Sequence, residues 1–400
     1  MKKFCFIIHL TFCFSLAAQD SLVVMYHNIL NFPGVTPNRV DSLRQIIQYV
    51  EPDVYVVNEL QSEAGADLIL NDALNVFGKT NYARAAFING PDTDNGLFYN
   101  TEKLGLISQT QIGTVLRDIS TYVMYYKAAN LSIGADTIYF HFFSCHLKAG
   151  SADHEQRNTE ATQLKYYLNS IADEVENVFV GGDFNFYSGF ESGCLTLKTS
   201  GSIPLEDPIG VTGNWSNDPA FSSVHTQSTR ISGGVGGDGS GGGMDDRFDM
   251  ILVSEDVMNN ENGVTYVNGS YEALGQDGIR FNGSIISPAN TAVPDSVAKA
   301  LYGASDHLPV VMRVALDETA SIHQQQKNIA VSYNVESHIL TFNTTEEVSG
   351  FVLYDLSGKV VFQQEGSDHL VQLPGSLSNG IYLWQLISEK HNHSGKIVVH

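Results

Sequence analysis

Eight polar residues lie within or at the ends of otherwise apolar segments of this 400-residue chain. They are Asn28, Glu59, His146, Asp183, Asn185, Asp249, Asp306 and His307. Carboxylates and amides bind hard cations through oxygen, and imidazoles donate hydrogen bonds to developing negative charge. Taken singly, each residue also has a structural explanation, such as turn capping by Asp183. Taken together, they are the set that a metal-assisted hydrolase requires.

Four of the eight residues are carboxylates, namely Glu59, Asp183, Asp249 and Asp306. Like charges in one cleft repel, and at about 4 Å with an effective dielectric near 20 each pair costs about 4 kcal/mol. Protons, the two histidines or a metal ion must therefore neutralise this cluster.

Periodic apolar segments predict the elements that carry these residues. Continuous or alternating apolar runs predict strands at 21–30, 53–60, 95–100, 177–185, 247–254 and 306–316, and a hairpin formed by 122–133 and 136–147. Spacings of three and four predict amphipathic helices at 40–50 and 161–171. We expect an α/β or α+β fold in layers. Because strand ends meet at one edge of a layered sheet, the eight residues are expected to line a cleft there.

The net charge of the chain excludes one way of binding nucleic acid. There are 22 Lys and Arg against 44 Asp and Glu, a net charge of -22. Binding of nucleic acid through a general basic face is excluded, because phosphate affinity comes largely from Lys and Arg. Cleavage of nucleic acid at a metal site is not excluded, since the ion supplies the positive charge.

Residues 1–19 have the pattern of a secretory signal peptide: Lys2 and Lys3, an apolar run from Phe4 to Leu16, and small residues for cleavage. We therefore expect a secreted or cell-surface protein. Removal of this segment leaves Cys145 and Cys194. Export permits a disulfide between them, but a buried free thiol is equally consistent with the sequence, and the pairing stays open.

Two segments further on have unusual composition. Residues 233–243 hold eight glycines and predict a flexible loop. Residues 318–327 are polar and aperiodic, which is typical of a linker. Beyond it, residues 328–400 alternate between apolar and polar in six or seven short runs, which predicts a small β-sandwich without a catalytic cluster.

The ordered motifs resemble the endonuclease/exonuclease/phosphatase superfamily, with the pancreatic deoxyribonucleases as a close pattern. These motifs are NIL (28–30), NELQ (58–61), NGLFYN (95–100), SCHL (144–147), GGDFN (181–185), DRFDMIL (246–252) and SDHLP (305–309). The resemblance covers residues 20–317. It implies a four-layer αββα sandwich that hydrolyses phosphodiesters with a divalent cation.

The same resemblance implies a role for each residue. Asn28, Glu59 and Asp306 would hold the cation, with Mg²⁺ favoured over Ca²⁺ or Mn²⁺. Asp183 would orient or deprotonate the attacking water, and Asn185 would hold that water or a phosphate oxygen. His146 and His307 would donate hydrogen bonds to the phosphate, with Asp249 orienting His307.

Three further residues complete this set of expectations. Asp94 is a candidate partner for His146. Arg157 and Arg230 are candidates for phosphate contacts, as is Arg247, although surface salt bridges explain them equally well. Gln61 stands where the pancreatic enzymes have a basic residue that enters the minor groove, and this departure weakens the case for duplex DNA as the substrate.

The tail has a resemblance of its own. SGFVLYDLSGKVV at 349–361, LSNGIYLWQL at 377–386 and KIVV at 396–399 resemble the C-terminal sorting domain of the type IX secretion system. This resemblance implies contact with outer-membrane secretion machinery. The alternative is a carbohydrate- or protein-binding β module.

Three functions fit the sequence. The first is a secreted, metal-dependent nuclease that acts as a monomer on nucleic acid. The second is a phosphatase or phosphodiesterase for phospholipids, as in sphingomyelinases, or for inositol phosphates, because one fold serves several substrates. The third is a surface binding protein with a relic site, against which the intact set of eight residues argues.

Overall fold

A computed structural model of the chain describes residues 20–34, 37–128, 131, 137–317, 330–334, 337–343, 348–356, 358–366, 369–388 and 392–399. The expected signal peptide, linker and hairpin turn lie outside these residues. The chain divides into two compact units, residues 1–321 and 322–400. Among the described residues, no helix combines the length and apolar character needed to cross a bilayer.

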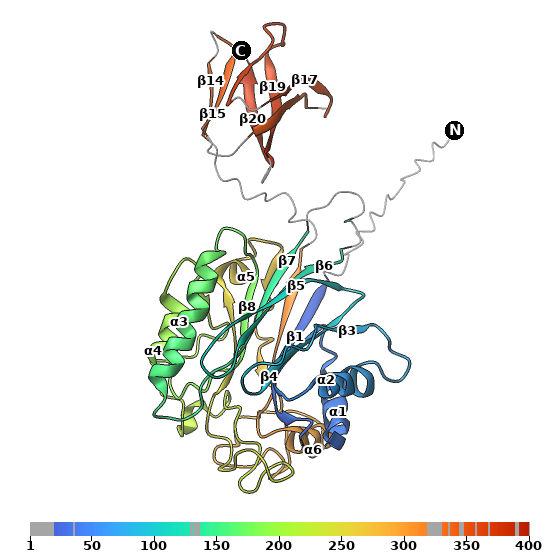
Figure 1. The fold of residues 1–400 in the computed structure, drawn as a ribbon, viewed down its shortest axis with the longest axis vertical. Coiled ribbons are helices and arrows are strands. Elements are labelled where there is room, and N and C mark those ends of the chain that lie inside the picture. The colour runs from blue at the N-terminus through green and yellow to red at the C-terminus, as the bar shows by residue number, and fades with distance from the viewer. Residues whose placement is uncertain are drawn as a thin grey trace, which may run out of the picture. The chain divides into compact units, whose positions relative to one another are not determined.

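Two facing sheets form the centre of the first unit (Figure 1). In spatial order, the first sheet contains β11 (Val264–Tyr266), β13 (Val310–Leu316), β1 (Ser21–Phe32), β2 (Val54–Leu60), β4 (Asp94–Asn100) and β3 (Tyr82–Arg84), with β12 (Glu272–Ala273) also paired to β13. The second contains β5 (Leu104–Ile112), β6 (Ile119–Tyr126), β7 (Tyr139–His146), β8 (Val178–Asp183), β10 (Asp249–Ser254) and β9 (Leu205–Glu206).

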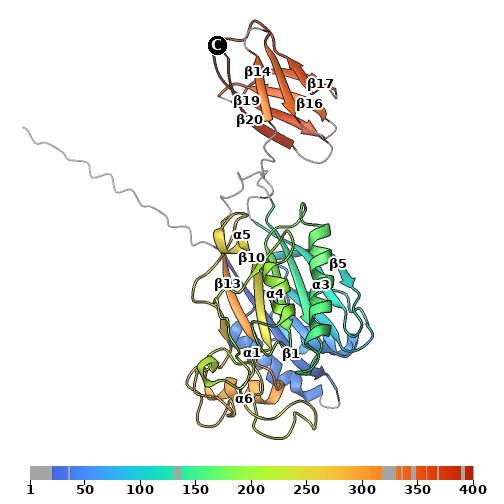
Figure 2. The same cartoon turned by 90° about the vertical axis from the view of Figure 1, so that its left-hand side faces the viewer.

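Helices cover the outer faces of both sheets (Figures 1 and 2). The first sheet packs against α1 (Val40–Val50), α2 (Glu63–Ile69) and α6 (Asp295–Ala304). The second packs against α3 (His154–Ser170) and α4 (Ser192–Thr199), while α5 (Glu255–Asn259) follows β10. One apolar core fills the space between the sheets and one more lies under each helical layer. The expected four-layer αββα sandwich is confirmed.

The apolar run that begins the described chain shows why the layers form. Residues 22–30 of β1 are all buried. Leu22, Val24 and Tyr26 point into the core between the sheets, and Val23 and Met25 point toward the helices. A strand covered on both faces needs apolar side chains at every position, so the continuous run specifies a central strand.

Helix α1 follows the predicted spacing closely. Val40, Leu43, Ile46, Ile47 and Val50 are its buried residues. The helix ends where Glu51 adopts a left-handed conformation with φ of 50°. Pro52 follows and lacks the backbone N–H that a further turn would need.

Some element boundaries differ from the sequence expectation. The strand expected at 122–133 is β6, which ends at Tyr126. The last strand begins at Val310, so Asp306 and His307 precede it in an extended segment bridged to Gln227. Cys145 and Cys194 are both buried free thiols, which settles the open question about their pairing.

The second unit is a β-sandwich of two sheets among its described residues. One contains β14 (Ala330–Asn334), β15 (Ile339–Asn343) and β18 (Leu370–Gln372). The other contains β17 (Val360–Glu365), β16 (Val348–Tyr354), β19 (Gly380–Ser388) and β20 (Asn392–Val399). Phe342, Phe351 and Trp384 lie at the centre of its own apolar core.

Because each unit has a separate core, we expect a protein that ends at Asp317 to fold and to keep its activity. Its Tm should change by less than about 3 °C, the shift that about 1 kcal/mol produces in a domain of this size. Circular dichroism and a phosphodiesterase assay on both lengths check this. An unfolded truncated protein would instead make the tail part of the catalytic fold.

Candidate active site

Three of the eight residues meet at one end of the second sheet. His146 is the last residue of β7, Asp183 the last of β8, and Asp249 the first of β10. In the strand registers, His146 pairs with Asp183 on one side and Asp249 pairs with Asp183 on the other. Adjacent strand ends therefore hold the three side chains together.

A bulge in the first sheet brings Glu59 to the same place. The β1–β2 register shifts between Asn28 and Phe32, and Glu59 adopts φ of 62°. A bulge redirects a side chain, and a left-handed non-glycine residue costs about 1–3 kcal/mol, a strain typical of functional sites. Asn28 Nδ2 then donates to Glu59 Oε1 at 2.9 Å and to Asp183 Oδ2 at 3.0 Å, which joins the two sheets.

The two glycines of the GGDFN motif permit this close approach. A Cβ at Gly181 would lie 2.8 Å from the ring of Tyr26, which belongs to the facing sheet. Gly182 has φ of +125°, and a Cβ there would lie 2.1 Å from the carbonyl oxygen of Cys145. Any larger residue would separate the sheets or displace Asp183.

His307 and Asp249 form a buried pair. The Nδ1 of His307 lies 2.7 Å from Asp249 Oδ2, and its Nε2 lies 3.7 Å from Asp183 Oδ2. Burial lowers the pKa of His307, but the carboxylates of Asp249, Asp183 and Asp306 outweigh burial and raise that pKa well above its usual value. The surrounding carboxylates therefore favour the protonated form of His307.

His146 lies on the other side of Asp183 and has the opposite character. Its Nε2 is 3.5 Å from Asp183 Oδ2 and 3.7 Å from Glu59 Oε1. Burial, together with Arg117 and His307, lowers its pKa well below the usual value, so this ring is neutral. Its Nδ1 is buried without a hydrogen-bond partner among the described residues. Asp94 does not contact this nitrogen in the structure, and its Oδ1 accepts from the backbone N–H of Gly90 at 2.6 Å.

The carboxylates crowd together in a way that suits a cation. Burial raises the pKa of Glu59, and burial with the nearby Asp249 and Glu59 carboxylates raises the pKa of Asp183 to about 7 against the opposing effect of His307. Ligand atoms of Glu59, His146 and Asp183 lie within 4.8 Å of one another. Asp306 Oδ1 is buried without a hydrogen-bond partner among the described residues. A divalent cation fits this crowding of oxygen donors.

Two of the expected cation ligands each have one oxygen engaged by a backbone N–H of the protein. The amide oxygen of Asn28 accepts from Leu30 N at 3.0 Å, so its nitrogen faces the carboxylates and its oxygen faces away from them. Asp306 Oδ2 accepts from Ser240 N at 2.7 Å. The glycine-rich segment 233–243 thus reaches the site and contacts Asp306.

Asn185 lies two residues beyond Asp183 and is also buried. Its backbone N–H donates to Asp183 Oδ1 at 3.0 Å, and its Nδ2 donates to Leu147 O at 3.2 Å. With φ of 51°, the chain turns sharply here, a conformation that asparagine tolerates. The turn keeps Asn185 beside Asp183, and the contact of its amide with water or a phosphate oxygen stays a prediction.

The three arginines that were expected to contact phosphate are buried and contact groups of the protein in this structure. Arg157 is fully buried and donates to both oxygens of Glu191, at 2.9 and 3.0 Å. Arg230 stacks on Tyr302 at 4.3 Å and donates to the Ser305 carbonyl, and Arg247 is paired with Asp207 at 2.7 Å. All three guanidinium groups hold the scaffold together.

A buried polar network that the sequence analysis missed supports Asp183. Asn58 Oδ1 accepts from the backbone N–H of Asp183 at 3.1 Å, and Asn58 Nδ2 donates to Asn95 at 2.7 Å and Ser144 at 3.0 Å. Ser305 Oγ donates to Asn28 O at 2.7 Å and accepts from His307 N at 3.1 Å. Isolated Asn and Ser residues at the ends of apolar strands were the available signal.

Two partly exposed residues at the site were also missed. Arg117 lies in the turn between β5 and β6, pairs with Asp92 at 3.0 Å, and is close enough to lower the pKa of His146. Gln227 lies 2.7 Å from His307 Nε2. Neither belongs to a motif, and only the fold places them near the catalytic strands.

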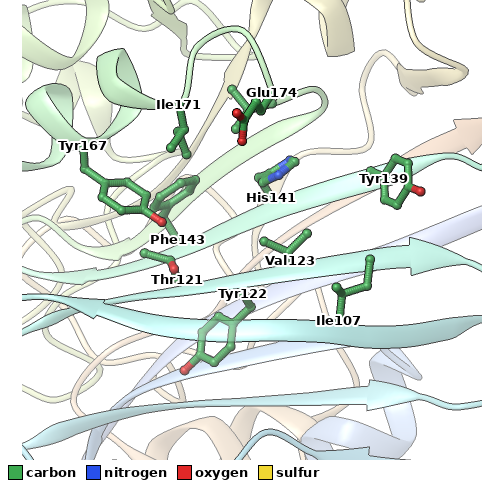
Figure 3. A pocket seen from close by; sticks show the side chains of 11 residues that line it. Ile107, Thr121, Tyr122, Val123, Tyr139, His141, Phe143, Tyr167, Ile171 and Glu174 are labelled. Carbon is green, nitrogen blue, oxygen red and sulfur yellow. The ribbon is translucent and has the colours of Figure 1, made fainter. Parts of the chain in front are cut away.

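A separate groove of about 440 Å³ lies on the outer face of the second sheet. Side chains of β5, β6, β7 and α3 line it, including Ile107, Val123, His141 and Tyr167 (Figure 3). His141 lies five residues before His146 on β7, roughly 16 Å away at about 3.3 Å per residue. The groove therefore contains none of the eight site residues.

The geometry agrees with a match to a known family. Residues 25–369 match the endonuclease/exonuclease/phosphatase family. The match covers more than half of the chain, which therefore belongs to this family, as the motifs predicted. It extends past residue 321 into the second unit. The chain is a metal-dependent hydrolase of phosphodiester bonds.

Solved structures with a similar fold include a family member from Bacteroides thetaiotaomicron, which is 16% identical with a TM-score of 0.47, over 75% of this chain and 99% of that one. Another is D. rerio TDP2 in complex with a single-strand DNA product, 13% identical with a TM-score of 0.48, over 74% and 98%. The human Nocturnin catalytic domain is 15% identical with a TM-score of 0.47, over 75% and 98%. No curated protein matches the chain.

Replacing Glu59 tests the cation site. Glu59→Gln removes one negative charge, so we expect Mg²⁺-dependent turnover to fall by at least about 100-fold, since a bound cation contributes several kcal/mol. The Tm in EDTA should hold or rise, because one repulsion is relieved. Glu63→Gln, at an exposed position on α2, is the control. Activity that survives both Glu59→Gln and EDTA would contradict the metal mechanism.

Replacing Asp249 tests the charged histidine. His307 is protonated below its raised pKa, so activity should decline only as pH rises through that value. Asp249→Asn removes the main charge partner, lowers this pKa, and should move the alkaline limb of the pH–rate profile to lower pH. We expect kcat to fall by up to about 10²–10⁴-fold, the range for positioned acid–base groups. An unchanged profile with a lower Tm would show that the pair is only structural.

Proposed function

We propose that the chain is a secreted nuclease that cleaves single-stranded nucleic acid in preference to duplex DNA. The observation that carries this proposal is the arrangement around Asp183. A charged His307 and a neutral His146 flank one carboxylate at 3.7 and 3.5 Å, and Asp249 fixes the charged ring. Environments that push the pKa values of two like groups apart assign them different tasks.

The residues then divide the reaction among themselves. Asp183, with a pKa of about 7, takes a proton from water as the water oxygen attacks phosphorus. The P–O bond to the leaving oxygen breaks in the same displacement, and that oxygen takes a proton from solvent. His307 donates a hydrogen bond to the phosphate and stabilises its developing charge, and neutral His146 donates from its other side. A divalent cation held by Glu59 and Asp306 would supply positive charge that offsets the phosphate and the carboxylates, and Mg²⁺ suits their oxygens.

Nearby side chains support a nucleic-acid substrate with accessible bases. The half-buried ring of Tyr187 packs edge-on against Phe248 at 5.0 Å and lies close enough for the Asp183 charge to affect its pKa. Aromatic rings stack on unpaired bases. Gln61 is exposed just after β2 and carries no charge for a duplex groove. Arg117, beside His146, offers a positive charge for a flanking phosphate.

Export is a further part of the proposal. The segment 1–19 would direct the chain into the secretory route, and residues 328–400 would carry it across the outer membrane as a type IX sorting domain. Deletion of residues 328–400 in the organism that encodes the protein should leave active enzyme in the periplasm. Normal export of the shortened chain would rule out the sorting role.

A substrate panel tests the nuclease proposal. Residues 20–400, with Mg²⁺, should degrade single-stranded DNA or RNA faster than duplex DNA, and both faster than sphingomyelin or inositol phosphates. Asp183→Asn serves as the inactive control for contaminating nucleases. End-labelled strands distinguish internal from terminal cleavage. Turnover that is highest on sphingomyelin or an inositol phosphate would replace the nuclease with a lipid or inositol-phosphate hydrolase.

A further inference from the structure

Gln227 lies in a segment whose other members are buried. His225, Thr226, Ser228 and Thr229 are each at most 2% exposed. Gln227 alone among them is only half-buried. The segment therefore presents one side chain toward accessible space, and that side chain is an amide.

The backbone holds Gln227 firmly in this position. Its carbonyl accepts from Asp245 N at 2.9 Å and from Asp246 N at 3.1 Å. On the other side, Leu308 N donates to Thr226 O at 2.8 Å, which ties the segment to the chain beside His307. The segment thus bridges the residues leading into β10 and those leading into β13, which carry Asp249 and His307.

The amide of Gln227 contacts two site residues at once. Its Nε2 donates to Asp306 Oδ2 at 3.2 Å and lies 2.7 Å from His307 Nε2. The other ring nitrogen of His307 is engaged by Asp249. Gln227 therefore occupies the direction along which His307 donates to a substrate.

A phosphate oxygen that accepts from His307 Nε2 must replace the direct contact between this ring nitrogen and Gln227 Nε2. In the contact with Gln227 Nε2, the ring nitrogen of His307 can only accept, because an amide nitrogen has no acceptor lone pair. When that ring nitrogen instead donates to a substrate, the two N–H groups need a common acceptor between or beside them. A phosphate oxygen is such an acceptor, and it would accept hydrogen bonds from both His307 Nε2 and Gln227 Nε2. A neutral donor also suits this position, because it adds no charge beside Asp306.

We propose that Gln227 is a phosphate-binding residue that donates, together with His307, to one non-bridging oxygen of the scissile phosphodiester. This inference rests on the phosphodiesterase activity of the family and does not depend on the nuclease proposal. It adds to the site a contact from a segment that carries no recognised motif.

Gln227→Met tests the contact, because methionine has a similar size and no donor. With bis-p-nitrophenyl phosphate, kcat/KM should fall by about 10- to 100-fold, the range for losing a hydrogen bond to a charged group. The Kd of inorganic phosphate, measured by calorimetry with Mg²⁺, should rise by a similar factor. Gln227→Glu should weaken phosphate binding further, because its carboxylate repels the anion.

Gln276→Met is the matched control. Gln276 is also half-buried, and its Nε2 donates at 3.0 Å to the carbonyl of His225, in the same segment but away from His307. We expect it to change Tm without changing the Kd of phosphate. The inference is overturned if Gln227→Met leaves that Kd unchanged, if Gln276→Met raises it equally, or if the wild type binds no phosphate. Diester hydrolysis without nucleic-acid cleavage would defeat only the nuclease proposal.

Discussion

The crowding of carboxylates where the two sheets meet is the constraint on which this site depends. Glu59 and Asp183 both lie within 3.0 Å of the same amide nitrogen of Asn28, and burial raises the pKa of each. Buried like charges are tolerated only with protons, hydrogen bonds or cations beside them. Three features stabilise these buried carboxylates: the protonated form of His307, the hydrogen bonds from Asn28, and the capacity to bind a divalent cation.

Irregular backbone conformations bring the carboxylates of the site together. The bulge at Asn28 and the left-handed Glu59 turn one carboxylate inward, while Gly181 and Gly182 let Tyr26 and the neighbouring strand approach Asp183. Both departures from regular strand geometry weaken the sheets locally. The surrounding cores outweigh that loss, because burial of each large apolar side chain contributes about 1.5–3 kcal/mol.

Much of the fold and most of the site could be predicted from the sequence. Strands and helices follow from apolar runs and periodic spacing, as β1 and α1 show, and the motifs specify all eight residues by type and order. The family assignment follows from the same motifs. The bounds of β6 and β13 were predicted less well, since β6 ends at Tyr126 and β13 begins at Val310, because strand bounds depend on backbone pairing as well as on hydrophobicity.

What the sequence by itself determined is the chemistry of the site: carboxylates, amides and two histidines at strand ends, and enough apolar residues to bury them. Tertiary structure decided which partners they have. Long-range packing places Arg157 against Glu191 and Arg230 against Tyr302, and Asp94 accepts from the backbone N–H of Gly90. Tertiary structure also decided the opposite pKa shifts of the two histidines and the contact of Gln227 with His307. Burial and charge depend on neighbours brought together from distant parts of the chain.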